Sequence, residues 1–174
     1  MKDVVFWRYD LPSVNREGWA VVVMCSDGYF STVSDWGNYA YWWSGHGTRD
    51  FRAFVADCDG DYIRCKLDPS KVLDYERTRD RCRRAVCEAR RRPARGPHAY
   101  TLDTETAREA WERADGFINE IELNDWFNDY ARYLDDYTDL AVYKTPPGIR
   151  GFIEKVLPRL QAAIKAELTR ECTP

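Results

Sequence analysis

The chain has 174 residues, of which 44% are hydrophobic and 32% are charged, with a net charge of −3. Seven Trp and eleven Tyr exclude a disordered chain, and the length suits one domain spanning residues 1–174. The acidic balance argues against a protein that coats nucleic acid non-specifically. The N-terminus has no long apolar run, so we expect neither a signal peptide nor a membrane-spanning helix, and a cytoplasmic location.

The N-terminal part is predicted to form an antiparallel sheet of about four strands in a meander. Segments rich in strand formers alternate with turn signals and cover residues 4–9, 19–26, 29–34 and 39–43. The turns contain Gly28 and Gly37, which can adopt the backbone conformation that tight hairpins need. The second strand is apolar on both faces, which is typical of a central strand covered on both sides.

A short helix is predicted after the sheet. It begins at Thr48 or at Arg49 and Asp50, and it ends by Asp59 and Gly60. Its apolar residues Phe51, Phe54 and Val55 recur at helical spacing. Residues 61–67 fit either a short helix or a strand. The sheet-rich part then closes at residue 70.

Residues 71–174 are predicted to be helical. The first helix covers residues 74–92, and a loop with two prolines, residues 93–100, separates it from a helix that begins at Asp103 or Thr104. The apolar stripe of that second helix recurs every three or four residues and comprises Ala107, Ala110, Trp111, Ala114, Phe117, Ile118 and Ile121.

Two features near the C-terminus concern helix boundaries. Asn124 and Asp125 either cap a third helix or bend the second. A loop at residues 146–148 is expected to precede the last helix, and Pro158 within that helix should kink it or remove one backbone bond. The whole pattern predicts an α+β fold, in which C-terminal helices cover one or both faces of the N-terminal antiparallel sheet.

Charge is distributed unevenly along the helical part. Residues 77–95 carry nine Arg and a net charge of +7, whereas residues 99–139 carry a net charge of −9. Adjacent helices of opposite charge can neutralise each other. Alternatively, the basic helix, with Arg83 and Arg84 at its centre, contacts nucleic acid or an acidic protein.

No familiar catalytic or metal-binding pattern is present in the sequence. The cysteines at positions 58, 65, 82 and 87 miss the spacing of a zinc site, and the aspartates from Asp57 to Asp68 miss a calcium loop because Tyr62 replaces its glycine. We therefore expect no metal, no cofactor and no catalytic residue. An enzyme with an unfamiliar site near His46, which lies between two glycines, is the third alternative.

Aromatic side chains in the sheet are the best candidates for partner binding. Trp36 lies in a turn between strands, where a large ring has little core to enter. Tyr39 and Trp43 belong to an aromatic strand whose side chains must point to both faces. Together with His46 and the two central arginines, these residues are predicted to bind the partner.

The segment GYFSTVSDWGNYAYWW, followed by GHG, resembles small, mostly uncharacterised proteins that are encoded by bacteriophages and prophages. The likeness is strongest over residues 7–67. It assigns no catalytic residues and implies an accessory phage product that acts in the cytoplasm of the infected bacterium.

The preferred function is therefore that of a non-enzymatic phage protein that binds a host protein machine. Inhibition of an antiviral defence system, in the manner of anti-CRISPR proteins, is the specific hypothesis. The alternative is a nucleic-acid-binding accessory protein that uses the basic helix and exposed aromatics.

Overall fold

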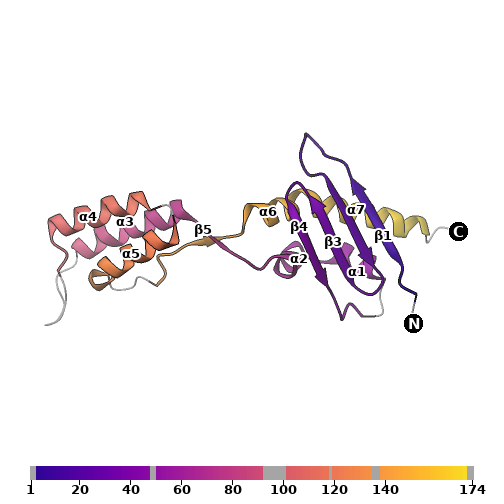
Figure 1. Cartoon of the computed structure of the whole chain (residues 1–174), viewed down its shortest axis with the longest axis horizontal. Coiled ribbons are helices and arrows are strands. Elements are labelled where there is room, and N and C mark those ends of the chain that lie inside the picture. The colour runs from indigo at the N-terminus through magenta and orange to yellow at the C-terminus, as the bar shows by residue number, and fades with distance from the viewer. Residues whose placement is uncertain (1–2, 48–49, 92–100, 118, 135–137, 172–174) are drawn as a thin grey trace. The chain divides into compact units, whose positions relative to one another are not determined.

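The computed structural model describes residues 3–47, 50–91, 101–117, 119–134 and 138–171. They form two compact units (Figure 1). The first unit combines Met1–Ser70 with Thr145–Pro174, and the second unit is Lys71–Lys144. The sheet precedes most of the helices in the chain, so the predicted α+β fold is confirmed.

The sheet of the first unit is a four-stranded antiparallel meander, as expected. Its strands are β1 (Phe6–Leu11), β2 (Ala20–Cys25), β3 (Tyr29–Ser34) and β4 (Gly37–Trp42), and they pair in that order. The hairpin glycines Gly28 and Gly37 have φ values of 96° and 119°. This left-handed conformation costs glycine little and other residues more, which explains why the chain turns at these two positions.

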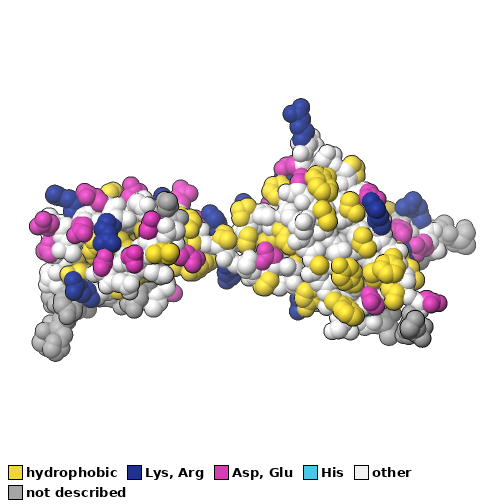
Figure 2. Space-filling model, in the orientation of Figure 1, with side chains coloured by type: hydrophobic (Ala, Val, Ile, Leu, Met, Phe, Trp, Pro, Cys, Tyr) yellow, Lys and Arg dark blue, Asp and Glu magenta, His cyan; other side chains and the backbone are white. Residues whose placement is uncertain are grey.

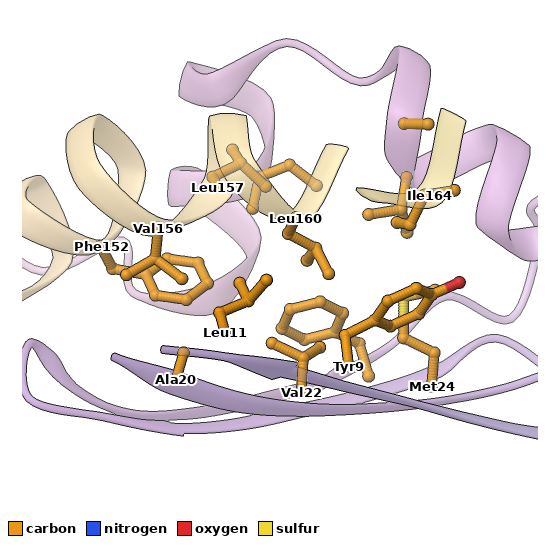
Figure 3. Close-up of a cluster of buried hydrophobic side chains, with 14 of the residues drawn as sticks. Tyr9, Leu11, Ala20, Val22, Met24, Phe152, Val156, Leu157, Leu160 and Ile164 are labelled. Atoms are coloured by element: carbon orange, nitrogen blue, oxygen red, sulfur yellow. The ribbon is translucent and has the colours of Figure 1, made fainter. Parts of the chain in front are cut away.

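One face of the sheet carries the core of the first unit. Tyr9, Leu11 and Val22 point from the strands toward Leu157 and Leu160 of the last helix (Figure 3). The opposite face carries no such cluster. The expectation that the second strand is covered on both sides is therefore wrong, because among the described residues the core of this unit takes in only the alternate residues Ala20, Val22 and Met24 of β2, while Val21 and Val23 are half-buried.

Two short helices follow the sheet. In α1 (Phe51–Asp57) the Asp50 carboxylate accepts a hydrogen bond from the backbone N–H of Arg52 at 2.8 Å. In α2 (Gly60–Leu67) Asp59 caps the first turn in the same way. The ambiguous segment at residues 61–67 is therefore helical, because its N-terminal donors are satisfied by a local cap.

The C-terminal residues return to the sheet as α6 (Pro147–Gly151), the wide π-helical turn η2 (Phe152–Val156) and α7 (Leu157–Glu171). Residues 146–148 are not all loop, because Pro147 is the first residue of α6, where its missing N–H is not needed. The wide turn lies directly before Pro158, which has no backbone N–H to donate to the preceding turn.

The second unit has a core of its own. It contains β5 (Val72–Leu73), α3 (Tyr75–Arg91), α4 (Thr104–Gly116), α5 (Glu120–Tyr130), the 3₁₀ turn η1 (Ala131–Tyr133) and β6 (Tyr143–Lys144). The alanines of α4 are buried against α3, and Trp126 donates from Nε1 to the carbonyl oxygen of Ala110 at 2.8 Å. The expected packing of C-terminal helices on the sheet thus holds for α7, whereas α3, α4 and α5 pack on one another.

Three details of the helical part differ from the sequence prediction. Asn119 caps α5 by accepting from the N–H of Glu122, so Asn124 and Asp125 lie inside that helix. Trp111 and Ile121, expected on the buried stripe, are exposed. The loop at residues 93–100 and Ile118 lie outside the described residues.

That the whole chain folds as a single domain stays a prediction. Calorimetry tests it, because a single domain is expected to unfold in one transition and two independent domains in two transitions.

Candidate functional site

Trp36 is packed into the first unit and is not displayed from the turn. Its ring lies against the core cluster and directly over Gly151 of α6. Its carbonyl oxygen accepts a hydrogen bond from the Tyr39 hydroxyl at 2.8 Å. The expectation that this ring finds little core to pack against is therefore wrong, because α6, which is far away in the sequence, supplies the surface on which it packs.

The other two aromatic candidates also face inward. Trp43 is buried between Phe30 and Phe51, and its Nε1 donates to the Tyr62 hydroxyl at 3.1 Å. Tyr39 packs on Phe152 with ring centroids 5.5 Å apart, and burial raises the pKa of its hydroxyl. Binding of a partner by either residue stays a prediction, but both stabilise the core.

His46 lies in the loop between the sheet and α1, where it is half-buried. Its ring centroid is 5.1 Å from that of Phe51, and its Nδ1 is buried without a hydrogen-bond partner in the described residues. The ring also lies 6.4 Å from that of Phe54, so the arrangement is one of aromatic packing.

Several arginines of α3 are engaged within the second unit. Arg83 pairs with Asp115 of α4, and its guanidinium lies 4.4 Å from the centroid of the Trp111 ring. Arg79 donates to the carbonyl oxygen of Phe117 at 2.6 Å. Arg84 is exposed, without an ion pair to another described residue. These contacts support neutralisation between neighbouring helices, since they join α3 to the acidic segment that follows it.

The uncovered side of the sheet is the largest candidate surface in the first unit. We call it the open face, and it comprises the alternate residues Phe6, Arg8, Asp10, Val21, Val23, Cys25, Tyr29, Ser31, Val33, Asn38, Ala40 and Trp42, of which Cys25 is buried. Hydrophobic side chains spread over the strands in Figure 2. Phe6, Val33 and Trp42 expose 68%, 51% and 62% of their surface, which is more than isolated apolar residues in a monomer need.

Trp42 is held in place on the open face. Its Nε1 donates to the carbonyl oxygen of Asp27 in the neighbouring hairpin at 2.9 Å. Across the strand pair it lies opposite Tyr29, which is also exposed. A large ring fixed before binding loses little conformational entropy when a partner covers it, so Trp42 has the properties of an interface anchor.

The sequence contains a signal for Trp42, although this residue is not among the predicted binding residues. Successive residues of a strand point to opposite faces. Because Tyr39, Tyr41 and Trp43 point toward the core, Asn38, Ala40 and Trp42 must point away from it. The alternation therefore selects Trp42 from the aromatic run, and not its neighbour Trp43.

A buried ionic cluster joins the sheet to the helices of the first unit. Arg52 is almost fully buried and forms ion pairs with Asp50 at 2.7 Å, Glu167 at 3.0 Å and Glu171 at 2.7 Å. Its guanidinium also lies 4.8 Å from the centroid of Trp7. The hydrogen bonds from Arg52 hold the pKa of Asp50 and of Glu171 below their ordinary values. The cluster joins β1, α1 and α7, which indicates a structural role.

Tyr9 completes the cluster, and its hydroxyl makes the free energy of unfolding fall at alkaline pH. Its hydroxyl donates to Glu167 at 2.5 Å, and burial followed by this bond raises its pKa far above the ordinary value of 10.0. Ionisation of Tyr9 is thus favoured in the unfolded chain. The stabilisation is complete below about pH 10 and is lost as the pH rises further.

We expect the urea midpoint of the protein to fall more steeply above about pH 10 than that of Tyr9→Phe, which has no hydroxyl to ionise. Parallel urea titrations of both proteins at several pH values measure the difference. Equal slopes would show that the Tyr9 proton is not linked to folding.

Metal chemistry has no support in the described geometry. Within the described residues, no three His, Cys, Asp or Glu side chains gather closely enough to hold a metal ion. Asp59, part of the calcium-like pattern, caps α2. Burial raises the pKa of Cys82 to about 12, so this thiol stays protonated in the helical core. His98 and Cys172 lie outside the described residues.

A cavity of about 470 Å³ in the second unit is polar, and its Arg113 and Asp129 pair with each other at 2.7 Å. None of the described helices has the length and apolar character needed to cross a bilayer. The open face is therefore the surface with the strongest physical case for binding.

Residues 2–166 match the sequence model of Phage_phiTE_072, which is described as a phage family. Neither a curated protein nor a solved structure matches the chain. The expected phage origin is confirmed by this match, while the aromatic motif as the mark of the group stays a prediction. Since the match covers nearly the whole sequence, the chain belongs to the phage family Phage_phiTE_072.

Proposed function

We propose that this phage protein is a non-enzymatic accessory protein that binds a protein partner through the open face of its sheet. The observation that carries the proposal is the apolar, outward-pointing set around Val33 and Trp42 on a sheet that is covered on one side only. Such a patch, displayed on a rigid sheet, is typical of a protein interaction site.

A host protein machine is the proposed target, and a component of an antiviral defence system is the specific candidate. Membership of a phage family supports action inside an infected bacterium, so the host cytoplasm is the proposed location. The apolar and aromatic side chains of the open face support a contact of the same character. The identity of the target is left to capture experiments.

Nucleic acid is the competing partner. The engagement of Arg79 and Arg83 with carbonyl and carboxylate groups disfavours it, since these guanidinium groups already have partners within the unit. A chain that binds phosphates through free arginines would lose affinity steeply with added salt. Apolar contacts of the open face predict a weak dependence on salt.

The test compares two single substitutions in residues of equal exposure. Val33 on the open face exposes 51% of its surface, and Val14 in the β1–β2 loop exposes 52%. Affinity-tagged protein is expressed in infected host cells, captured, and analysed by mass spectrometry. We expect Val33→Lys to reduce capture of the host protein at least about 30-fold, as for a hot spot of 2 kcal/mol, and Val14→Lys to have no effect.

Two results would contradict the proposed function. If both variants capture the same host proteins as the unchanged chain does, the open face is not the binding surface. If capture disappears when nuclease is added, the partner is nucleic acid and the proposed function is wrong.

A further inference from the structure

We infer that a second copy of this chain covers the open face, so that two sheets pack face to face across a two-fold axis. This inference rests on the proposed function, because it names what covers the same surface until the host protein takes its place. It follows from the area of the face, from its charge and from the residues that border it.

The area of the open face is sufficient for a weak dimer. Four strands with a spacing of about 4.8 Å, each six residues long at about 3.3 Å per residue, form a footprint of roughly 19 Å by 20 Å. Two such footprints with side-chain relief bury on the order of 1,000 Å² in total, which is the lower limit for a specific interface. Exposed Trp19, directly before β2, extends the patch.

The charge of the open face permits pairing with itself. Arg8 and Asp10 are the charged residues among its twelve positions, and they pair within the same strand at 2.8 Å. The face therefore carries no net charge, and two copies can approach without repulsion between like charges. A strongly charged partner would find no complementary group in the centre of the sheet, where Val21, Val23 and Val33 lie.

In a two-fold symmetric dimer, each edge strand of one copy faces a defined strand of the other copy. With the two-fold axis along the strands, β1 of one copy lies over β4 of the other. The Arg8 and Asp10 pair then lies opposite Ala40 and Asn38, and not opposite the same ion pair in the other copy. The apolar central strands β2 and β3 cover each other, which removes their valines from water.

The experiment measures the mass of the full-length protein by sedimentation equilibrium and light scattering over a series from low to high micromolar concentration. We expect the unchanged chain and Val14→Lys to shift from monomer to dimer across this series. Val33→Lys should stay monomeric throughout, because two lysines would be buried at the centre of the interface. Phe6→Lys, at the exposed start of β1, provides a second variant that leaves the middle of the sheet intact, and we expect it to weaken the dimer at least tenfold.

Far-UV circular dichroism confirms that each variant is folded before its mass is compared. An unchanged chain that stays monomeric at every concentration overturns the inference, as does a dimer that neither variant weakens. Host capture tests the proposed function independently of the dimer. A monomeric chain whose host capture still depends on Val33 disproves the dimer alone, whereas a dimer lost in Val33→Lys with unchanged host capture supports the dimer and disproves host binding through this face.

Discussion

Replacing Arg52 by alanine should lower the free energy of unfolding by about 3 kcal/mol, the lower end of the range for breaking a buried ion pair. The substitution leaves the carboxylates of Asp50, Glu167 and Glu171 close to one another without their shared cation. It also removes the guanidinium from the Trp7 ring. The lower end of the range applies because all three carboxylates retain contact with water.

Urea unfolding followed by circular dichroism measures this loss. Arg8→Ala is the matched control, since Arg8 also pairs with an aspartate at 2.8 Å but is exposed, and it should leave the midpoint unchanged. Arg52→Lys should restore only part of the stability, because an ammonium group cannot reproduce the two-pronged contacts of the guanidinium. A loss for Arg52→Ala no larger than that for Arg8→Ala would contradict the structural role of the cluster.

The second large effect is expected at Gly151, where α6 contacts the turn that carries Trp36. A Cβ atom added at Gly151 would overlap atoms of the Trp36 ring, and one added at Gly148 would lie 2.8 Å from the Trp36 carbonyl oxygen. Gly151→Ala should therefore cost about 2 to 3 kcal/mol of unfolding free energy, as overpacking in a core does. This loss would occur although alanine favours a helix more than glycine does.

A double-mutant cycle identifies the cause of that loss. In a Trp36→Ala background the overlap is absent, so Gly151→Ala should become neutral or slightly stabilising. Trp36→Ala alone should cost about 2 kcal/mol, since the ring is only partly buried. Gly45→Ala, where an added Cβ meets no atom within 4 Å, is the control for the loss of glycine itself. Equal losses for Gly151→Ala in both backgrounds would exclude the ring as the cause.

The sheet could be predicted from the sequence because its signals are local. Strand formers, alternation and the hairpin glycines Gly28 and Gly37 act within a few residues of one another, and each strand lies close to its expected position. The same holds for the start of α1, where Asp50 belongs to one of the two expected starts. The start of α5 also has a local signal, since Asn119 followed by Glu122 is the pattern of a helix cap, whereas Asn124 and Asp125, the expected cap or bend, lie inside the helix.

The candidate site could not be predicted in the same way, because burial depends on distant segments. Trp36 is covered by Gly151, which follows 115 positions later in the sequence, and Arg52 pairs with a glutamate that is 119 positions away. No pattern around either residue reports these partners. The division between two cores was equally hidden, since the apolar stripe of α4 is the same whether it faces a sheet or another helix.

Because the first unit is discontinuous in the sequence, its sheet is synthesised well before the helix that covers it. Its strands are made first, but α7 is translated only after the whole of Lys71–Lys144. The apolar side of the nascent sheet, with Tyr9, Val22 and Met24, must wait for Leu157 and Leu160 before it is shielded from water. The helical unit draws its core from neighbouring segments and can close at once. During infection we therefore expect the unfinished sheet to be the species that needs chaperones, and we expect translation pauses after residue 144 to raise aggregation of the protein.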